Sequence, residues 1–354
     1  MNPVNVDITK ITIKRKYMSN LFKKVAVFTD LHFGLKSNSN IHNQDCDDFV
    51  DWFIAKAKDE GCDVGIFMGD YHHNRNSLNI VTMDYSLRAL EKLGAAFEEF
   101  YFFPGNHDLY YKDKRDIHSV EFGKYIPGIN VVTEPTTIGG VTLCPWLVGD
   151  EWKSIGNKDA KYIFGHFELP SFFMNAMVQM PDHGELQLDS FNSYELGFSG
   201  HFHKRQSRGN MHYIGNAFPH NYSDTWDDER GMMVLEWGGQ PEYFTWDAQP
   251  TFRTVKLSQL LNNADTILKP KQHLRVSLDI DISFEEATFI KEKYIKEYNI
   301  REITLIPEKK SIEINTQLDV QSFESIDQIV ANQIIGIDSE KYNKNILLSI
   351  YNEL

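Results

Sequence analysis

Phe102-Phe103-Pro104-Gly105-Asn106-His107-Asp108 is the stretch around which the rest of the chain can be ordered. An apolar run stops there at a Pro-Gly turn, which is the pattern of a buried strand that ends in a loop. The loop carries an amide, an imidazole and a carboxylate in succession, and such groups can bind a hard cation and supply a proton donor beside it. A single loop of this kind is also compatible with an ordinary turn, so the prediction depends on whether the pattern recurs.

The same pattern occurs four more times between Val25 and His203. Each time a short apolar run ends abruptly and metal-binding side chains follow; these are Asp30 with His32, Asp70, His166, and His201 with His203. In an extended strand exit, residues two apart point to the same side, so Asp30 and His32 can bind one ion, and His201 and His203 present two imidazoles on one side. Asp70 is the candidate bridging ligand, because a carboxylate can hold two cations about 4 Å apart.

Apolar runs alternate with segments of helical periodicity over the first two thirds of the chain. Strands are predicted at 25–28, 63–68, 101–103, 131–132, 141–143, 162–164, Phe198, 211–215 and 231–237, and helices at 44–59 and 78–93. This alternation predicts a layered α/β fold in which ligands gather at the carboxyl ends of the strands. The irregular segment 168–195 is predicted to be a loop or lid near the site.

Length and composition indicate a globular protein without covalent cross-links. The chain has 354 residues, of which 42% are hydrophobic and 24% charged, enough for a large core and an appended module. Three widely spaced cysteines give neither a disulfide framework nor a thiolate zinc site, which suits a reducing compartment and predicts a cytoplasmic location. No apolar run approaches the roughly 20 residues of a membrane span, and no signal peptide is recognisable.

The charge balance restricts how nucleic acid can bind. With 36 Lys+Arg against 50 Asp+Glu the formal charge is −14, which argues against binding over the whole surface by counterion release. A polyanion must therefore be held locally. Basic residues do cluster in three places, namely within residues 1–36, at Lys112, Lys114 and Arg115, and at Lys204, Arg205 and Arg208. Each cluster is equally compatible with solvated surface charge.

Four segments are predicted along the chain. Residues 1–20 form an N-terminal arm, 21–246 the α/β domain, 247–316 a strand-helix-strand module, and 317–354 a pair of amphipathic helices. Within the module, Ser283-Phe284-Glu285-Glu286 is a capping box that opens a helix. A further short strand is predicted at 312–314. The metal-binding patterns lie entirely within the α/β domain.

The residues together match a hydrolytic site with two metal ions. One ion is assigned to Asp30, His32, Asp70 and His203, and the other to Asp70, Asn106, His166 and His201. His107 is placed to stabilise the transition state or protonate the leaving oxygen, and Asp108 to orient an imidazole. Imidazole with carboxylate suits manganese, iron or zinc better than magnesium or calcium. The remaining histidines 42, 118, 183, 212, 220 and 273 are interpreted as satisfied core or surface residues.

Five motifs resemble those of the calcineurin-like metallophosphoesterases. They are Asp30-x-His32-x-Gly34, Gly69-Asp70, Gly105-Asn106-His107-Asp108, Gly165-His166 and Gly200-His201-x-His203. Within that family the chain looks most similar to the SbcD/Mre-type recombination nucleases and their compact tailed-phage members. The resemblance implies a four-layer α/β sandwich, two manganese ions and His107 as the catalytic histidine. It also implies DNA exonuclease or endonuclease activity in recombination, repair or replication, as a homodimer with an SbcC/Rad-type ATPase. The expected location is the cytoplasm, which is the host cytoplasm if the chain is encoded by a phage.

Other interpretations remain open on sequence alone. The module resembles the DNA-capping domain of the nucleases, and the terminal helices resemble their ATPase-docking element, although simple packing on the module explains the helices equally well. The main alternative is a phosphatase or cyclic-nucleotide phosphodiesterase with the same metals. A protein Ser/Thr phosphatase would carry Asp-Arg-Gly after the second motif, whereas this chain has Tyr71-His72-His73. A binding scaffold with a vestigial centre is disfavoured because no ligand position has been replaced.

Overall fold

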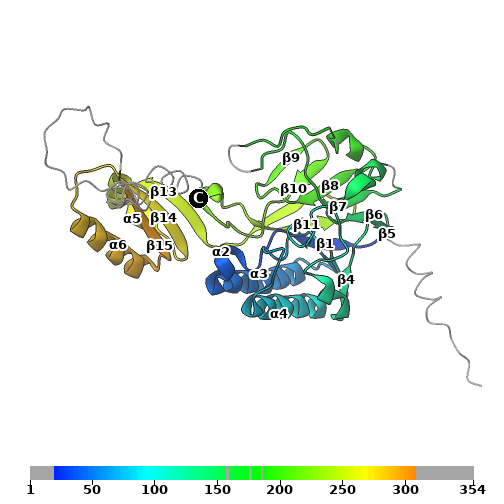
Figure 1. Ribbon diagram of the computed structural model, residues 1–354, viewed down its shortest axis with the longest axis horizontal. Helices are drawn as coiled ribbons and strands as arrows, with labels where there is room; N and C mark the ends of the chain where they lie inside the picture. The colour runs from blue at the N-terminus through cyan, green and yellow to red at the C-terminus, as the bar shows by residue number, and fades with distance from the viewer. Residues whose placement is uncertain (1–19, 157–158, 175–177, 185, 308–354) are drawn as a thin grey trace, which may run out of the picture.

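A computed structural model describes residues 20–156, 159–174, 178–184 and 186–307, and these contain two six-stranded sheets and one three-stranded sheet (Figure 1). The first sheet is mixed, with parallel strands from β1 to β4 and antiparallel pairing at β11 and β12. Its strand order is β12 (Glu242–Thr245), β11 (Gly231–Glu236), β1 (Lys24–Phe28), β2 (Val64–Phe67), β3 (Glu99–Phe102) and β4 (Ile129–Val131).

The second sheet has a parallel centre and antiparallel edges. Its order is β5 (Thr136–Ile138), β6 (Val141–Cys144), β7 (Tyr162–His166), β8 (Leu196–Gly200), β10 (Met211–Tyr213) and β9 (Gln206–Arg208). Because β1, β2, β3, β7 and β8 all lie within parallel sets, the loops that leave their carboxyl ends are gathered at sheet edges.

The central strands of both sheets are buried on both faces, as the continuous apolar runs predicted, whereas the edge strands β5, β9 and β12 are partly exposed. Phe28 faces a core beneath the helices α3 (Asn40–Asp59) and α4 (Ile80–Ala96), whereas Val27 faces a second core shared with the other sheet. A third core covers the outer face of the second sheet, where short 3-10 helices such as η3 (Leu188–Phe191) replace long ones. The predicted layered α/β fold is therefore confirmed. None of the described helices combines the length and apolar character needed to cross a bilayer.

A three-stranded parallel sheet forms a separate module with its own core, seen on the left in Figure 1. It consists of β13 (Thr251–Lys256), α5 (Leu257–Ile267), β14 (Gln272–Leu278), α6 (Phe284–Tyr298) and β15 (Glu302–Pro307). The predicted capping box is confirmed, because the Ser283 hydroxyl accepts from the Glu286 amide at 3.2 Å and the Glu286 carboxylate accepts from the Ser283 amide at 3.0 Å. Helix α5 was not predicted.

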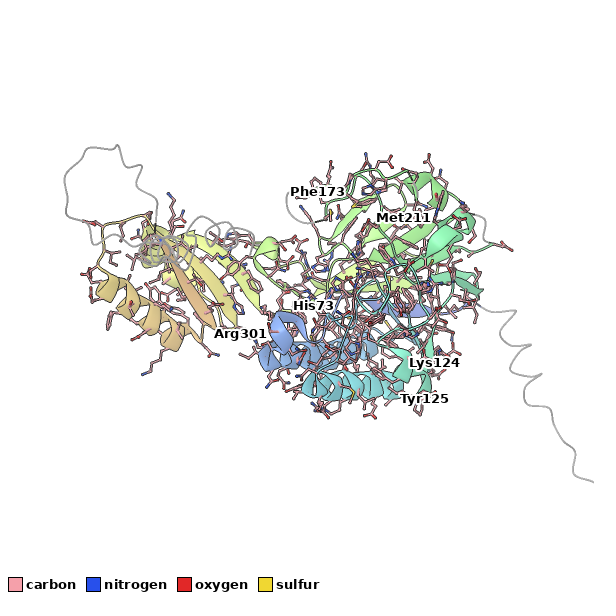
Figure 2. All side chains as sticks on the ribbon, viewed as in Figure 1. His73, Lys124, Tyr125, Phe173, Met211 and Arg301 are labelled. Carbon is pink, nitrogen blue, oxygen red and sulfur yellow. The ribbon has the colours of Figure 1, made fainter. Side chains whose placement is uncertain are left out.

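Ion pairs connect the module to the two-sheet body. Both terminal nitrogens of Arg301 donate to the buried carboxylate of Asp45 in α3, each at 2.6 Å. Lys271 also donates to Asp48, at 3.3 Å. Figure 2 shows Arg301 at the side of the module that faces the body. The predicted arm at residues 1–20, apart from its last residue, the strand at 312–314 and the helices in 317–354 lie outside the described residues.

Candidate metal centre

The carboxyl ends of five parallel strands deliver the predicted metal-binding side chains to one place. Asp30 and His32 follow β1, Asp70 follows β2, and Asn106 follows β3. From the second sheet, His166 ends β7, and His201 and His203 follow β8. Hydrogen bonds tie these exits together, since the amides of residues 31 and 32 both donate to the Asp70 carbonyl, at 3.1 and 3.0 Å. All seven predicted ligands therefore come from strand ends that meet at one edge.

Four of these residues have the left-handed backbone conformation that non-glycine residues rarely adopt. The φ angles are 53° at Asp30, 54° at His32, 61° at Asp70 and 84° at His201. Such a conformation costs on the order of 1–3 kcal/mol per residue and persists where the surrounding structure imposes it. Strain concentrated at three neighbouring strand exits is typical of a site selected for side-chain placement rather than for stability.

The carboxylate of Asp70 lies between two groups of donor atoms. Asp70 Oδ2 is 3.6 Å from His32 Nε2 and 3.5 Å from His166 Nε2. One donor atom from each of Asp30, His32 and Asp70 lies within 4.8 Å of the others, and the same holds for Asp70, His166 and His201. Two groups that share one carboxylate are the arrangement that a two-metal site requires.

The remaining predicted ligands extend both groups. The side-chain oxygen of Asn106 lies 3.1 Å from His166 Nε2 and 3.0 Å from His201 Nδ1, while His203 Nε2 lies 3.8 Å from Asp30 Oδ1. His166 Nδ1 donates to the Met68 carbonyl at 2.6 Å, so Nε2 is the nitrogen that can bind a metal ion.

The donor set fits divalent cations, because it contains a buried polar group that the protein itself does not satisfy. His32 is only 3% exposed, and neither of its ring nitrogens has a hydrogen-bond partner within the described structure. Buried polar atoms are normally paired, so an imidazole beside two carboxylates that has no hydrogen bond to the protein is suited to bind a cation. The mixture of imidazole, carboxylate and amide oxygen suits ions such as manganese, iron or zinc.

Glycines permit the loops to approach each other closely. A Cβ on Gly105 would lie 2.2 Å from Asp70 Oδ1, and a Cβ on Gly200 would lie 2.1 Å from the Thr29 hydroxyl and 2.8 Å from Asp30 Oδ2. These separations are too short for any side chain. Glycine is therefore required at positions 105 and 200, in the third and fifth motifs, for Asp70 and Asp30 to take their positions.

Electrostatic coupling within the centre is strong. Burial raises the pKa of Asp70, but the adjacent imidazoles, His166 foremost, outweigh it and hold that pKa well below its usual range. Burial lowers the pKa of His166, yet Asp70 outweighs burial and raises it to about 9. For His32, burial dominates and lowers the pKa well below its usual value. The centre therefore holds buried negative charge that positive charge must balance.

His107 and Asp108 follow Asn106 but have different surroundings. The His107 amide donates to Asp70 Oδ1 at 2.8 Å, and its ring Nδ1 lies 2.9 Å from the His73 carbonyl. Asp108 was predicted to orient an imidazole. Its carboxylate instead accepts from the amides of Gly105 and His72, each at 2.9 Å, and lies 3.9 Å from the His72 ring. Burial, followed by the charge of Asp70, raises the pKa of Asp108 to about 6.

Three residues of the centre were not predicted from the sequence. The His73 ring stacks on His107 with centroids 5.2 Å apart, and in Figure 2 it lies on the side of the body nearer the module. The Glu168 carboxylate lies 3.0 Å from His201 Nε2, which lowers the pKa of Glu168. His220, interpreted as a satisfied histidine, is buried with both ring nitrogens unpaired within the described structure. Only Glu168 carried a signal in the sequence, because it lies two residues after His166 of the fourth motif.

A cavity of about 340 Å³ lies beside the His166 side of the centre. Its lining includes Trp146, Trp152, Leu186, Glu168 and Lys112. The Trp146 ring also lies 5.2 Å from the His201 ring, centroid to centroid. Arg115 braces this wall by donating to the Trp146 carbonyl at 2.6 Å and by pairing with Glu151. The cavity is thus an aromatic pocket that adjoins the metal-binding residues.

Comparison with known proteins identifies the family. One match extends over residues 23–205, which is more than half of the chain and includes every predicted metal ligand. The chain belongs to the calcineurin-like phosphoesterase family. The resemblance predicted from the five motifs is confirmed at this level, and members of this metallophosphoesterase family use divalent metals.

Individual relatives share less than a third of their aligned residues with this phosphoesterase. It is 28% identical over 222 residues to exonuclease subunit 1 of Enterobacteria phage T4, a match that covers 60% of this chain and 64% of the relative. The phosphoesterase therefore spans less than two thirds of that relative's length. Nuclease MPE of Pseudomonas putida is 17% identical in structural alignment, with 53% of this chain and 66% of that chain covered and a TM-score of 0.27.

Proposed function

We propose that the chain is the nuclease subunit of an SbcCD/Mre-Rad-type complex and hydrolyses DNA phosphodiester bonds with two divalent metal ions, manganese being the expected metal. Asp30, His32 and His203 would hold one ion, and Asn106, His166 and His201 the other, with Asp70 shared. The observation that carries this proposal is the position of the Asp70 carboxylate between the two donor groups, 3.6 Å from His32 and 3.5 Å from His166. Membership of the calcineurin-like phosphoesterase family supports hydrolysis of a phosphate ester as the reaction.

The bound cations and three nearby residues would have separate roles in hydrolysis. Bound cations supply charge to stabilise the phosphate and lower the pKa of an attacking water. His107 donates a proton to the leaving oxygen from Nε2, because its Nδ1 is held by the His73 carbonyl. The stacked ring of His73 keeps the His107 imidazole in place. Asp108 fixes the loops that carry Asp70 and Asn106 through its bonds to backbone amides.

Two observations support a polynucleotide substrate. The cavity beside His166 has two tryptophans in its wall and Lys112 at its edge, so it can stack a nucleobase while a basic group faces the phosphate chain. The T4 relative is an exonuclease subunit by name. A chain of formal charge −14 needs such local contacts to hold DNA.

The proposal extends to the organisation of the chain. Residues 21–246 form the nuclease domain and 247–316 a module that caps bound DNA. The location of the module on the His73 side of the body supports this (Figure 2). Residues 317–354 dock an SbcC/Rad-type ATPase, and two copies of the chain associate as a homodimer. If deletion of 320–354 leaves ATPase binding unchanged, the docking role is wrong.

Cleavage of linear DNA by the full chain tests the nuclease assignment. Asp70→Asn should abolish both Mn²⁺ binding and cleavage, because it removes the shared carboxylate. His107→Gln should retain Mn²⁺ binding but lose about 10²- to 10⁴-fold in kcat, the usual contribution of a proton donor. His212→Gln is the matched control, since His212 is half-buried in β10 against Phe198.

Undiminished cleavage by the Asp70 and His107 variants would refute the site. A p-nitrophenyl phosphate monoester or a cyclic nucleotide turned over far faster than DNA would contradict the substrate and favour the phosphatase or cyclic-nucleotide phosphodiesterase alternative.

A further inference from the structure

His220 is a buried imidazole that the proposed mechanism does not use. It lies between β10 and β11 and is 1% exposed. Its backbone amide donates to Asp224 Oδ2 at 2.8 Å, which fixes the position of the residue. Neither ring nitrogen has a hydrogen-bond partner within residues 20–307 as far as these are described. A fully buried polar ring of this kind needs an explanation, because native structures leave few such atoms unpaired.

The ring of His220 faces two of the residues assigned to the first ion. Its centroid is 5.4 Å from the His32 ring and 5.3 Å from the His203 ring, at interplanar angles of 89° and 87°. One nitrogen from each of the three imidazoles lies within 4.8 Å of the other two. Three nitrogens gathered in this way are spaced for a shared cation rather than for apolar packing.

The other neighbours of His220 do not satisfy its nitrogens. His42, whose ring centroid is 5.4 Å away, is already engaged because its Nε2 lies 3.0 Å from the His32 carbonyl. Phe218, on another side at 5.1 Å, offers only an aromatic ring. His32 has the same deficit as His220, since both of its nitrogens are unpaired. A single cation between the rings would engage one nitrogen of each of these two imidazoles.

We propose that His220 is an additional ligand of the ion held by Asp30, His32 and His203, so that this ion receives three imidazoles. The inference rests on the proposed function, because it presupposes the two-metal centre. It makes the two ions chemically unequal, with the first bound more tightly and with a stronger preference for manganese, iron or zinc over magnesium.

Metal titration of the full chain tests this role apart from activity. His220→Leu retains similar side-chain volume and removes both nitrogens. Wild-type protein should bind two Mn²⁺ by calorimetry or electron paramagnetic resonance, and the variant should bind one of them at least about 10-fold more weakly. Pulsed electron paramagnetic resonance should show fewer coupled ¹⁴N nuclei in the variant. His212→Leu, a half-buried histidine of β10 remote from this cluster, should change neither quantity.

Thermal unfolding separates a ligand from a packing residue. As a ligand, His220 adds nothing to the metal-free protein, so the metal-free Tm of His220→Leu should equal or exceed that of wild type while the Mn²⁺-induced rise shrinks. A lower metal-free Tm with unchanged Mn²⁺ affinities would overturn the proposal. If wild type binds no Mn²⁺, or Asp70→Asn binds it equally well, the two-metal function itself fails. If Asp70→Asn loses Mn²⁺ binding and His220→Leu keeps it, the two-metal function stands and His220 is not a ligand.

Discussion

Gly105→Ala tests whether the close approach of two loops positions the metal centre. A Cβ on residue 105 would lie 2.2 Å from Asp70 Oδ1 and 2.4 Å from the Asp70 amide nitrogen. Cβ contacts below 3.0 Å essentially do not occur, so Asp70 or the turn must move by at least about 0.8 Å. Asp70 is the shared carboxylate, and a misplacement of about 1 Å can cost about 10²-fold in rate. We expect kcat/KM for DNA to fall by that factor, with weaker Mn²⁺ binding.

Gly61→Ala is the matched control for this substitution. Gly61 follows α3 with a φ of +70°, and no atom lies within 4 Å of a Cβ placed there. Alanine at this position should therefore cost about 1–2 kcal/mol of stability through its left-handed backbone alone. It should leave Mn²⁺ affinity and cleavage intact. Wild-type Mn²⁺ affinity and cleavage in Gly105→Ala, or equal impairment of both in Gly61→Ala, would show that the close approach of Gly105 to Asp70 does not position the centre.

Two further substitutions test the pocket and the module. Trp152→Ala should weaken binding of single-stranded DNA by about 1–3 kcal/mol, which is the contribution of one stacked base. The control Trp226→Ala, at an exposed tryptophan outside the pocket, should leave DNA binding unchanged. Fluorescence anisotropy measures DNA binding by both variants, and equal effects would exclude stacking in the pocket. Arg301→Ala should destabilise the attachment of the module by up to about 3 kcal/mol, because the buried Asp45 carboxylate loses both short hydrogen bonds and keeps only the longer contact to Lys271, at 3.6 Å. Hydrogen exchange in β15 reports this loss, and Lys293→Ala, which breaks an exposed pair, should leave exchange unchanged.

The sequence was sufficient to predict the layered fold and the proximity of the metal-binding residues. Runs such as 25–28 and 162–164 are apolar on both faces, so they predict buried strands, and the polar residues that follow them mark strand ends. Parallel pairing then places those ends at one edge. Asp30 and Asp70 are 40 positions apart in sequence, but adjacent strands β1 and β2 carry them.

Other features depend on tertiary contacts that no local pattern encodes. Asp70 takes its left-handed conformation within hydrogen bonds between loops, and the Asp108 carboxylate accepts from the Tyr71 and His72 amides, which follow the second motif. His220 looked like an isolated histidine because the residues it faces lie far away in sequence. The pairing of Asp45 with Arg301 spans 256 positions, and charge alone does not predict such a partner.

Anomalous diffraction from crystals grown with Mn²⁺ tests the central claim most directly. We expect two manganese peaks per chain, both adjacent to the carboxylate of Asp70, one on the His32 and His203 side and the other on the His166 side. Peaks remote from Asp70, or a single peak that does not touch its carboxylate, would contradict it.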